Sequence, residues 1–198
     1  MAADRVMQSV TSWLERKLRL RVSATKTKVV RPTKSNFLGF TFWKSKDGWK
    51  CRPAKDRKKK LYEKTREILC RKKATARTIK STFMQLNWLI RGWINYYRIG
   101  SMKGFLDEYG QWLRHKVRVV ILKQWKKPET IFRNLTALNR IQKCGFEEKR
   151  LLSVANARQG WYRMAAIRDI NFLLNPTILG KKTKSRPGLT DPLAYYLS

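Results

Sequence analysis

The sequence predicts a mainly α-helical protein with a small α/β piece at its N-terminus. β-Branched and aromatic residues gather in short runs before Pro53, which is typical of strands, whereas apolar residues recur at helical spacing after it. Of the 198 residues, 42% are hydrophobic, which is enough to build the core of one domain or of two small ones. We therefore expect a helical bundle that is preceded by a helix and a β-hairpin.

The N-terminal piece begins with a predicted helix over residues 3–19, whose apolar residues recur every three or four positions. The runs KTKVVRP (26–32) and NFLGFTFW (36–43) then predict strands. Asp47-Gly48 predicts a hairpin turn, and residues 49–53 predict the returning strand. These strands are too few for an independent sheet, so the piece is interpreted as part of a larger domain.

Helices are predicted for most of the chain after Pro53. The second of them has the clearest apolar stripe, and Thr78 is its predicted N-cap because a hydroxyl there can accept a hydrogen bond from the first turn. The predicted helices cover residues 55–73, 78–98, 102–125, a shorter stretch from Pro128, 151–157 and 167–174. The chain from Gly180 onward is predicted to be loop with one last turn.

The charge balance indicates a polyanionic partner. The chain carries 46 Lys and Arg residues against 13 Asp and Glu, which gives a net charge of +33. These positive charges are spread from Arg5 to Arg186, so their mutual repulsion opposes compaction unless a polyanion neutralises it. Nucleic acid is the expected partner. A membrane surface is the weaker alternative, and we expect no membrane partner, since the sequence has no long apolar span.

The sequence argues against a metal site and against secretion. Cys51, Cys70 and Cys144 form no CxxC pair, and His115 is the single histidine, so a zinc site is not expected. An odd number of scattered cysteines fits reduced thiols. The N-terminal MAADRVMQSV lacks the apolar stretch of a signal peptide, so we expect a cytoplasmic protein.

The stretch WLIRGWINYYRIG (88–100) is both aromatic and basic, and two interpretations of it are open. In the first, its aromatic residues belong to the core or fill the gap to the helix predicted at 102–125. This interpretation assigns to packing the residues Trp88, Ile90, Trp93, Ile94, Tyr96 and Tyr97.

In the second interpretation, one face of this stretch binds RNA. Trp88, Arg91 and Asn95 share that face, at spacings of three and four residues. Aromatic rings stack on unpaired bases, arginine takes a phosphate or a base edge, and asparagine can read an edge. Gly92 carries no side chain and would let a phosphate backbone or another helix approach closely.

The motifs of the chain follow an order that resembles the C-terminal half of group II intron reverse transcriptase–maturases. NFLGFTF is followed by a basic helix, then by LNWLIRGWINYYRIG and FLDEYGQWLRHKVR. The segment LIRGWINYYRI is similar to the hallmark of that family's maturase-specific region, which is also its thumb. Upstream, SVTSWLERKLRLRVSATKTKVVRPTKSNFLGFTF resembles the last part of the palm; downstream, NARQGWYRMAAIRDINFLLNPTILGKK and GLTDPLAYYLS resemble the family's end.

This resemblance, which covers nearly the whole chain, implies three parts. Residues 1–53 would be the C-terminal remnant of the palm, with a hairpin similar to the primer grip at Phe37, Leu38, Gly39 and Phe40. Residues 54–160 would be the helical thumb and maturase-specific domain. Residues 161–198 would form a C-terminal helix and a basic tail.

The resemblance also implies what this chain lacks. In the family's palm, a Tyr-Ala-Asp-Asp box holds the two magnesium ions that drive nucleotide addition. This sequence has no such box, and none of its aspartates neighbours another. We therefore expect no catalytic residue, no metal ligand and no cofactor in this chain alone, and we interpret it as a fragment. An alternative is that a separate palm chain completes a functional RNA-directed DNA polymerase.

The helical region is expected to bind RNA. In the family this region binds group II intron RNA and helps it fold, while the RNA itself performs splicing. The predicted contacts combine a basic run that tracks phosphates with polar and aromatic side chains that make more specific contacts. They are Lys55, Arg57, Lys58, Lys59, Lys60, Lys64, Arg71, Lys72, Lys73, Arg91, Asn95, Tyr96, Arg98, Arg114, Lys116 and Arg118. A DNA target or primer is a further candidate partner, and a generic basic nucleic-acid-binding protein remains an alternative.

Overall fold

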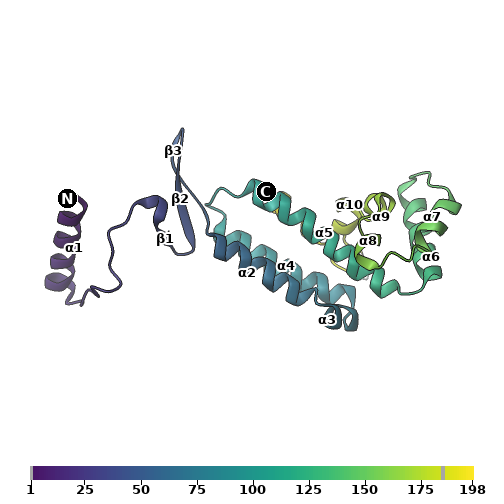
Figure 1. The fold of residues 1–198 in the computed structure, drawn as a ribbon, viewed down its shortest axis with the longest axis horizontal. Helices are drawn as coiled ribbons and strands as arrows, with labels where there is room; N and C mark the ends of the chain where they lie inside the picture. Colours follow the sequence, from purple (N-terminus) through teal and green to yellow (C-terminus); the bar gives the residue numbers. More distant parts are fainter. Residues whose placement is uncertain (1, 184–185) are drawn as a thin grey trace. The chain divides into compact units, whose positions relative to one another are not determined.

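The computed structural model describes residues 2–183 and 186–198, apart from the side chain of Arg71. The chain divides into two compact units, Met1–Ala54 and Lys55–Ser198, called here the N-terminal unit and the helical unit. Helices dominate the described residues, and a small antiparallel sheet lies in the N-terminal unit, which confirms the predicted fold class (Figure 1).

The N-terminal unit combines one helix with a small sheet. Helix α1 (Ala2–Leu18) matches the predicted helix and has no buried residue; its Trp13 is 54% exposed. A 3-10 turn η1 (Pro32–Lys34) leads into strands β1 (Asn36–Phe37), β2 (Phe40–Ser45) and β3 (Gly48–Pro53). The strands pair antiparallel in the order β1-β2-β3.

Two strand predictions for this unit were wrong. The run 26–32 forms no strand, because the residues that the structure describes offer it no pairing partner, and Val30 is half exposed. The run 36–43 is two strands rather than one. Leu38 and Gly39 have φ values of 51° and 82°, so the chain reverses there and Phe37 pairs with Phe40.

The β2–β3 turn lies one residue earlier than predicted. Ser45 pairs with Gly48, so Lys46 and Asp47 form the two-residue connection. Gly48 follows with a φ of 116°, a conformation that residues with a side chain rarely adopt. The predicted hairpin is thus confirmed, with its glycine at the start of the returning strand rather than in the turn.

The helical unit begins with four helices, α2 (Lys55–Ile68), α3 (Arg71–Ala76), α4 (Ile79–Tyr97) and α5 (Lys103–Trp125). The predicted helix over 55–73 is therefore two, because the chain leaves helical geometry at Cys70, whose ψ is 131°. Thr78 caps α4 as predicted, its side chain accepting a hydrogen bond from the Ser81 amide at 3.2 Å.

Apolar stripes hold these helices together. On α4 the predicted stripe is buried at Phe83, Leu86, Ile90, Ile94 and Tyr97. On α5 the stripe Leu106, Tyr109, Leu113, Val117 and Val120 is buried as well. The hydroxyl groups of Tyr109 and Thr65 lie 2.7 Å apart and join α5 to α2 inside this core. None of the described helices is long and apolar enough to cross a lipid bilayer.

The other end of the unit is formed by α6 (Pro128–Gln142) and by the shorter helices α7 (Glu148–Ala155), α8 (Trp161–Met164), α9 (Arg168–Leu173) and α10 (Pro176–Gly180) (Figure 1). α6 packs on α7 and α9, and α8 packs on α5. The Arg150 guanidinium donates two hydrogen bonds, at 2.6 and 2.7 Å, to the buried carboxylate of Asp169. This pair ties α7 to α9.

The C-terminal segment (186–198) returns along the long helices. It ends in α11 (Pro192–Leu197), which packs against α4 and α5. The described residues of 161–198 lie in the same compact unit as residues 55–160. The segment crosses α10 closely: the Leu189 amide donates to the Leu179 carbonyl at 2.8 Å.

Gly188 is required at this crossing. A Cβ placed on it would lie 1.8 Å from the Gly180 carbonyl oxygen, so Gly188→Ala must push two backbone segments apart. We expect the variant to lose about 2 kcal/mol of stability and to melt roughly 4–8 °C lower in calorimetry.

Gly104→Ala on α5 is the matched control, because a Cβ there meets no atom within 4 Å. Alanine also favours a helix over glycine by up to about 1 kcal/mol, so this variant should melt at the wild-type temperature or above. Equal melting temperatures for the two variants would contradict the close crossing.

Candidate nucleic-acid interface

The basic residues of α2 divide between two faces. Arg57, Lys60 and Lys64 are spaced three and four residues apart and face α4, whereas Lys55, Lys58 and Lys59 face α5. From the sequence, these residues are predicted to form one run that tracks phosphates. The structure instead places them along two grooves, one on each side of α2.

The first, the α2–α4 groove, encloses about 380 Å³. Its basic wall is formed by Arg57, Lys60 and Lys64, and α4 contributes Trp88, Leu89, Gly92, Trp93 and Tyr97. A Cβ built on Gly92 would meet no other atom within 4 Å, so open space lies above this glycine. A phosphate backbone can therefore approach α4 at this point.

The second, the α2–α5 groove, encloses about 790 Å³ and is lined by aromatic rings. Tyr62 packs edge-on against Phe105 and Trp112, with ring centroids 6.0 and 4.7 Å away. Lys58 Nζ lies 4.8 Å from the Phe105 centroid, and the Arg66 guanidinium lies 5.7 Å from that of Trp112. Cations thus already cover part of these aromatic faces.

The aromatic residues of the stretch 88–100 have different environments. Tyr97 is buried, and Trp93 packs on it with ring centroids 4.6 Å apart, so packing explains both residues. Tyr96 is 55% exposed and contacts Tyr97 edge-on. Trp88 is 69% exposed and fills no gap to α5. The packing interpretation therefore fits Trp93 and Tyr97 and fails for Trp88.

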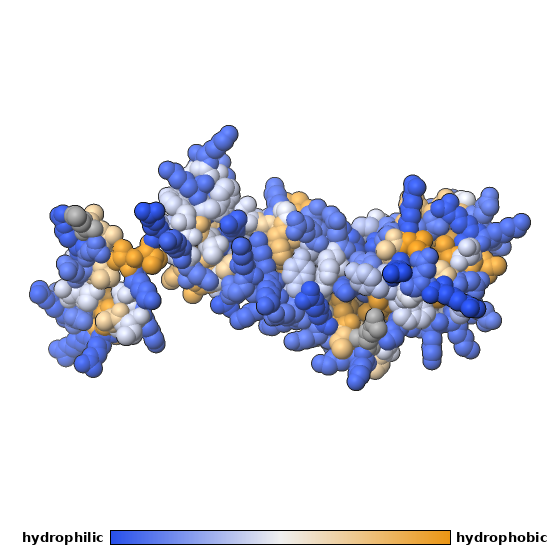
Figure 2. All heavy atoms as spheres, in the orientation of Figure 1, coloured by the Kyte–Doolittle hydropathy of each residue, from blue (hydrophilic) through white to orange (hydrophobic). Residues whose placement is uncertain are grey.

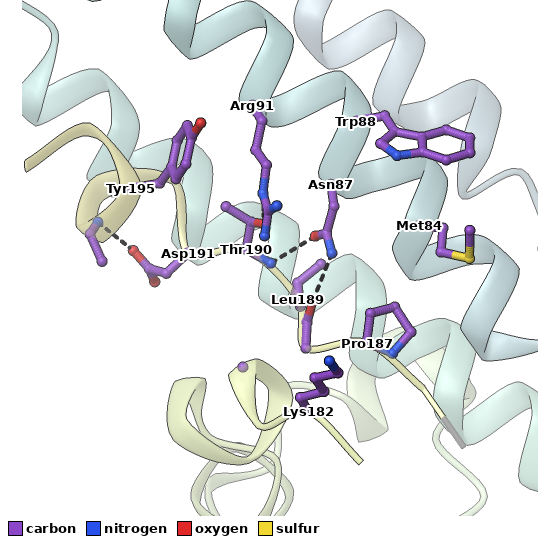
Figure 3. Close-up of a pocket in the computed structure, with 13 residues that line it drawn as sticks. Met84, Asn87, Trp88, Arg91, Lys182, Pro187, Leu189, Thr190, Asp191 and Tyr195 are labelled. Atoms are coloured by element: carbon purple, nitrogen blue, oxygen red, sulfur yellow. Dashed lines mark hydrogen bonds between the residues drawn. The ribbon is translucent and has the colours of Figure 1, made fainter. Parts of the chain in front are cut away.

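Arg91 and Asn95, two of the predicted RNA contacts, face the C-terminal segment. Arg91 Nε donates to the Thr190 hydroxyl at 3.0 Å, and its guanidinium lies 5.6 Å from the Tyr195 ring centroid (Figure 3). Asn95 Oδ1 accepts a hydrogen bond from the Tyr195 hydroxyl at 3.1 Å. Both side chains stay exposed at their edges, yet each already has a protein partner.

Asn87 is a key residue that was not predicted from the sequence. Its Nδ2 donates to the Gly188 carbonyl and its Oδ1 accepts from the Thr190 amide, both at 2.8 Å (Figure 3). It is only 6% exposed. Its position between Phe83 and Ile90 on the apolar stripe could have predicted this role, because a buried amide needs hydrogen-bond partners.

The predicted extension of the basic surface onto α5 does not fit the geometry. Arg114 forms an ion pair with Asp191 at 2.8 Å. Arg118 is 8% exposed and donates to the Leu174 carbonyl at 3.0 Å; burial, and next the charge of Arg114, lower its pKa to about 10. Lys116 is half-buried, 4.9 Å from the Tyr162 ring centroid. These three residues mainly join parts of the helical unit.

The remaining predicted RNA contacts lie at the surface. Lys72 and Lys73 are exposed on α3, and Arg98 is exposed at the C-terminal end of α4. The side chain of Arg71 lies outside the described part of the structure. Figure 2 shows hydrophilic side chains over much of the visible face, with apolar patches between them.

The residues that resemble a primer grip surround the β1–β2 turn. Phe37 and Leu38 are each 65% exposed, and Phe40 is buried. Leu38 adopts a left-handed φ of 51°, which is unfavourable for a residue with a branched side chain. The turn therefore presents two apolar side chains to solvent and holds one of them in a strained conformation.

No group of three His, Cys, Asp or Glu side chains that could hold a metal ion occurs among the described residues. Cys51, Cys70 and Cys144 are not in disulfide bonds. The two grooves beside α2 combine basic and aromatic side chains in concave surfaces.

Two asparagines on α4 provide a test of these assignments. Asn87→Ala leaves a buried carbonyl and a buried amide unpaired, so we expect a loss of about 2 kcal/mol of stability. Asn95→Ala removes one exposed hydrogen bond and should cost less than about 1 kcal/mol. Urea unfolding of both variants measures the difference. Equal losses would contradict the assignment of Asn87 as the residue that fixes the C-terminal segment.

Comparison with known families supports an identity for the helical unit. Residues 58–138 match the family model described as the group II intron, maturase-specific domain. The match spans α3, α4 and α5 and most of α2 and α6, and it includes nearly all residues that line the two grooves. No curated protein matches the chain. The sequence resemblance is thereby confirmed for residues 58–138, which match the maturase-specific domain of group II intron proteins.

Proposed function

We propose that this chain binds group II intron RNA through the grooves beside α2 and helps that RNA fold for splicing, as a fragment of an intron-encoded reverse transcriptase. The maturase-specific domain at residues 58–138 supports a maturase-type function. The observation that carries the proposal is the α2–α4 groove, where three basic side chains line an opening above Gly92.

The electrostatics favour a polyanion over a neutral partner. Lys60 and Lys64 are exposed along one groove, and Lys55 and Lys59 along the other. Each phosphate that such side chains neutralise releases condensed counterions, which makes the affinity for RNA strongly dependent on salt. A net charge of +33 adds a long-range attraction that speeds association.

In this proposal the chain acts by positioning the RNA, and the RNA supplies the splicing chemistry. Phosphate contacts would fix the register of the RNA along α2, while aromatic residues in the grooves would contact unpaired bases. We place this activity in the cytoplasm, where the three cysteine thiols would stay reduced. The proposal requires no cofactor of its own; magnesium belongs to the palm of the intact family enzyme.

A second candidate function is part of an RNA-directed DNA polymerase that a separate palm chain completes. The exposed apolar side chains of α1, Val6, Val10 and Trp13, favour it, because a partner surface would cover them. A DNA primer at the β1–β2 turn would belong to this candidate. If the wild type captures a palm chain in a pull-down and the Trp13→Glu variant does not, the polymerase candidate is supported. If the wild type captures no palm chain, the candidate is rejected.

Reversing two groove charges tests the proposed RNA site. Lys60→Glu/Lys64→Glu should weaken binding to a group II intron RNA at least tenfold and reduce the log–log salt slope by about 1.5, because two phosphate contacts are lost. Filter binding at several salt concentrations measures both quantities.

Arg133→Glu/Arg158→Glu is the control, since it changes the net charge equally at exposed sites on α6 and after α7. It should reduce the affinity much less. If both double variants lose the same affinity for RNA, the RNA is attracted by the net positive charge and not by the groove. Equal affinity of the wild type for an unrelated RNA of the same length would contradict intron recognition.

A further inference from the structure

Trp88 has an environment that packing does not explain. It is 69% exposed, the highest exposure among the exposed tryptophans Trp13, Trp49 and Trp88. The rings of Trp93 and Trp112 make aromatic or cation–π contacts, whereas the Trp88 ring makes none with the described residues. Exposing so large an apolar surface is unfavourable unless a ligand covers it.

Trp88 borders two concave surfaces. On one side it lines the α2–α4 groove with Lys60 and Lys64. On the other side it lines a second cavity, the Trp88 pocket, which lies between α4 and the C-terminal segment and encloses about 630 Å³ (Figure 3). That volume suits a ligand the size of a nucleotide. An RNA strand that lies in the α2–α4 groove can therefore pass the Trp88 ring and enter the pocket.

The walls of the Trp88 pocket combine apolar surface with a few polar groups. Met84 and Trp88 from α4 and Pro187 and Leu189 from the C-terminal segment form the apolar part. In Figure 3, Asn87 and Arg91 reach from α4 toward the C-terminal segment, and Trp88 lies beside them on the same helix. An aromatic ring could thus lie against Trp88 without displacing these contacts.

Most polar groups of the pocket already have partners. Asn87 holds the C-terminal backbone through both ends of its amide. The Asp191 carboxylate accepts from Arg114 and from the Ala194 amide, and the Thr190 hydroxyl accepts from Arg91. The positively charged groups that remain for a ligand are the exposed Lys182 ammonium and the terminal nitrogens of Arg91.

We propose that the Trp88 pocket takes an unpaired nucleotide of the bound RNA, with its base stacked on Trp88 and its phosphate held by Lys182 and Arg91. This inference rests on the proposed RNA-binding function and assigns it a nucleotide subsite. Flat apolar surface beside donor groups fits a base and a phosphate together. Because stacking on Trp88 uses the flat face of the base, the subsite holds any base.

The test compares two RNA oligomers of about eight nucleotides at low salt, one of uridines and one of abasic residues with the same backbone. Stacking on one side chain contributes enough that Trp88→Ala should weaken binding to the uridine oligomer about tenfold. Its affinity for the abasic oligomer should stay unchanged. Trp88→Phe, which keeps an aromatic face, should restore most of the affinity for the uridine oligomer.

Trp49→Ala is the control, because Trp49 is also an exposed tryptophan but lies on β3 and does not line the Trp88 pocket. Circular dichroism checks that each variant remains helical. If Trp88→Ala binds both oligomers as the wild type does, or weakens both equally, the nucleotide subsite is overturned while RNA binding stands. If the wild type binds neither these oligomers nor intron RNA, the proposed function itself fails.

Discussion

The hydrogen bonds between Asn87 and the backbone of Gly188 and Thr190 determine how the surface of α4 is used. They join positions 101 and 103 residues apart and hold the C-terminal segment against α4. An unpaired amide at this buried position would be costly, so the segment and the helix stabilise each other. Once the segment is in place, Thr190 and Tyr195 provide partners for Arg91 and Asn95. The Trp88 pocket exists because the same segment forms its second wall.

The stretch 88–100 is both aromatic and basic because its faces contact different parts of the structure. One face supplies core residues, with Trp93 and Tyr97 completing an aromatic cluster toward α5. A second face meets the C-terminal segment. A third carries Gly92 and the exposed Trp88 toward α2, whose lysines lie across the groove. A helix that contacts three partners cannot show the simple division into apolar and polar faces that an isolated surface helix shows.

The sequence predicted the long helices well and the roles of individual arginines poorly. The spacing of apolar residues predicted α4 and α5, and the preference for threonine as an N-cap predicted that α4 starts after Thr78. Both features depend only on residues that are close in the sequence. Arg118 looked like a surface cation beside Lys116, yet it binds the Leu174 carbonyl, 56 residues away. The strand break at Leu38 was missed because a leucine rarely adopts a positive φ. Such outcomes depend on tertiary partners that no local pattern identifies.

The central claim is that intron RNA lies along α2, and lysine acetylation measured by mass spectrometry tests it most directly. Lys60 and Lys64 line the α2–α4 groove, whereas Lys149 is exposed on α7 at the other end of the unit (Figure 1). Bound group II intron RNA should slow the acetylation of Lys60 and Lys64 several-fold and leave Lys149 unchanged. Uniform protection of all three lysines, or protection of Lys149 alone, would contradict the claim.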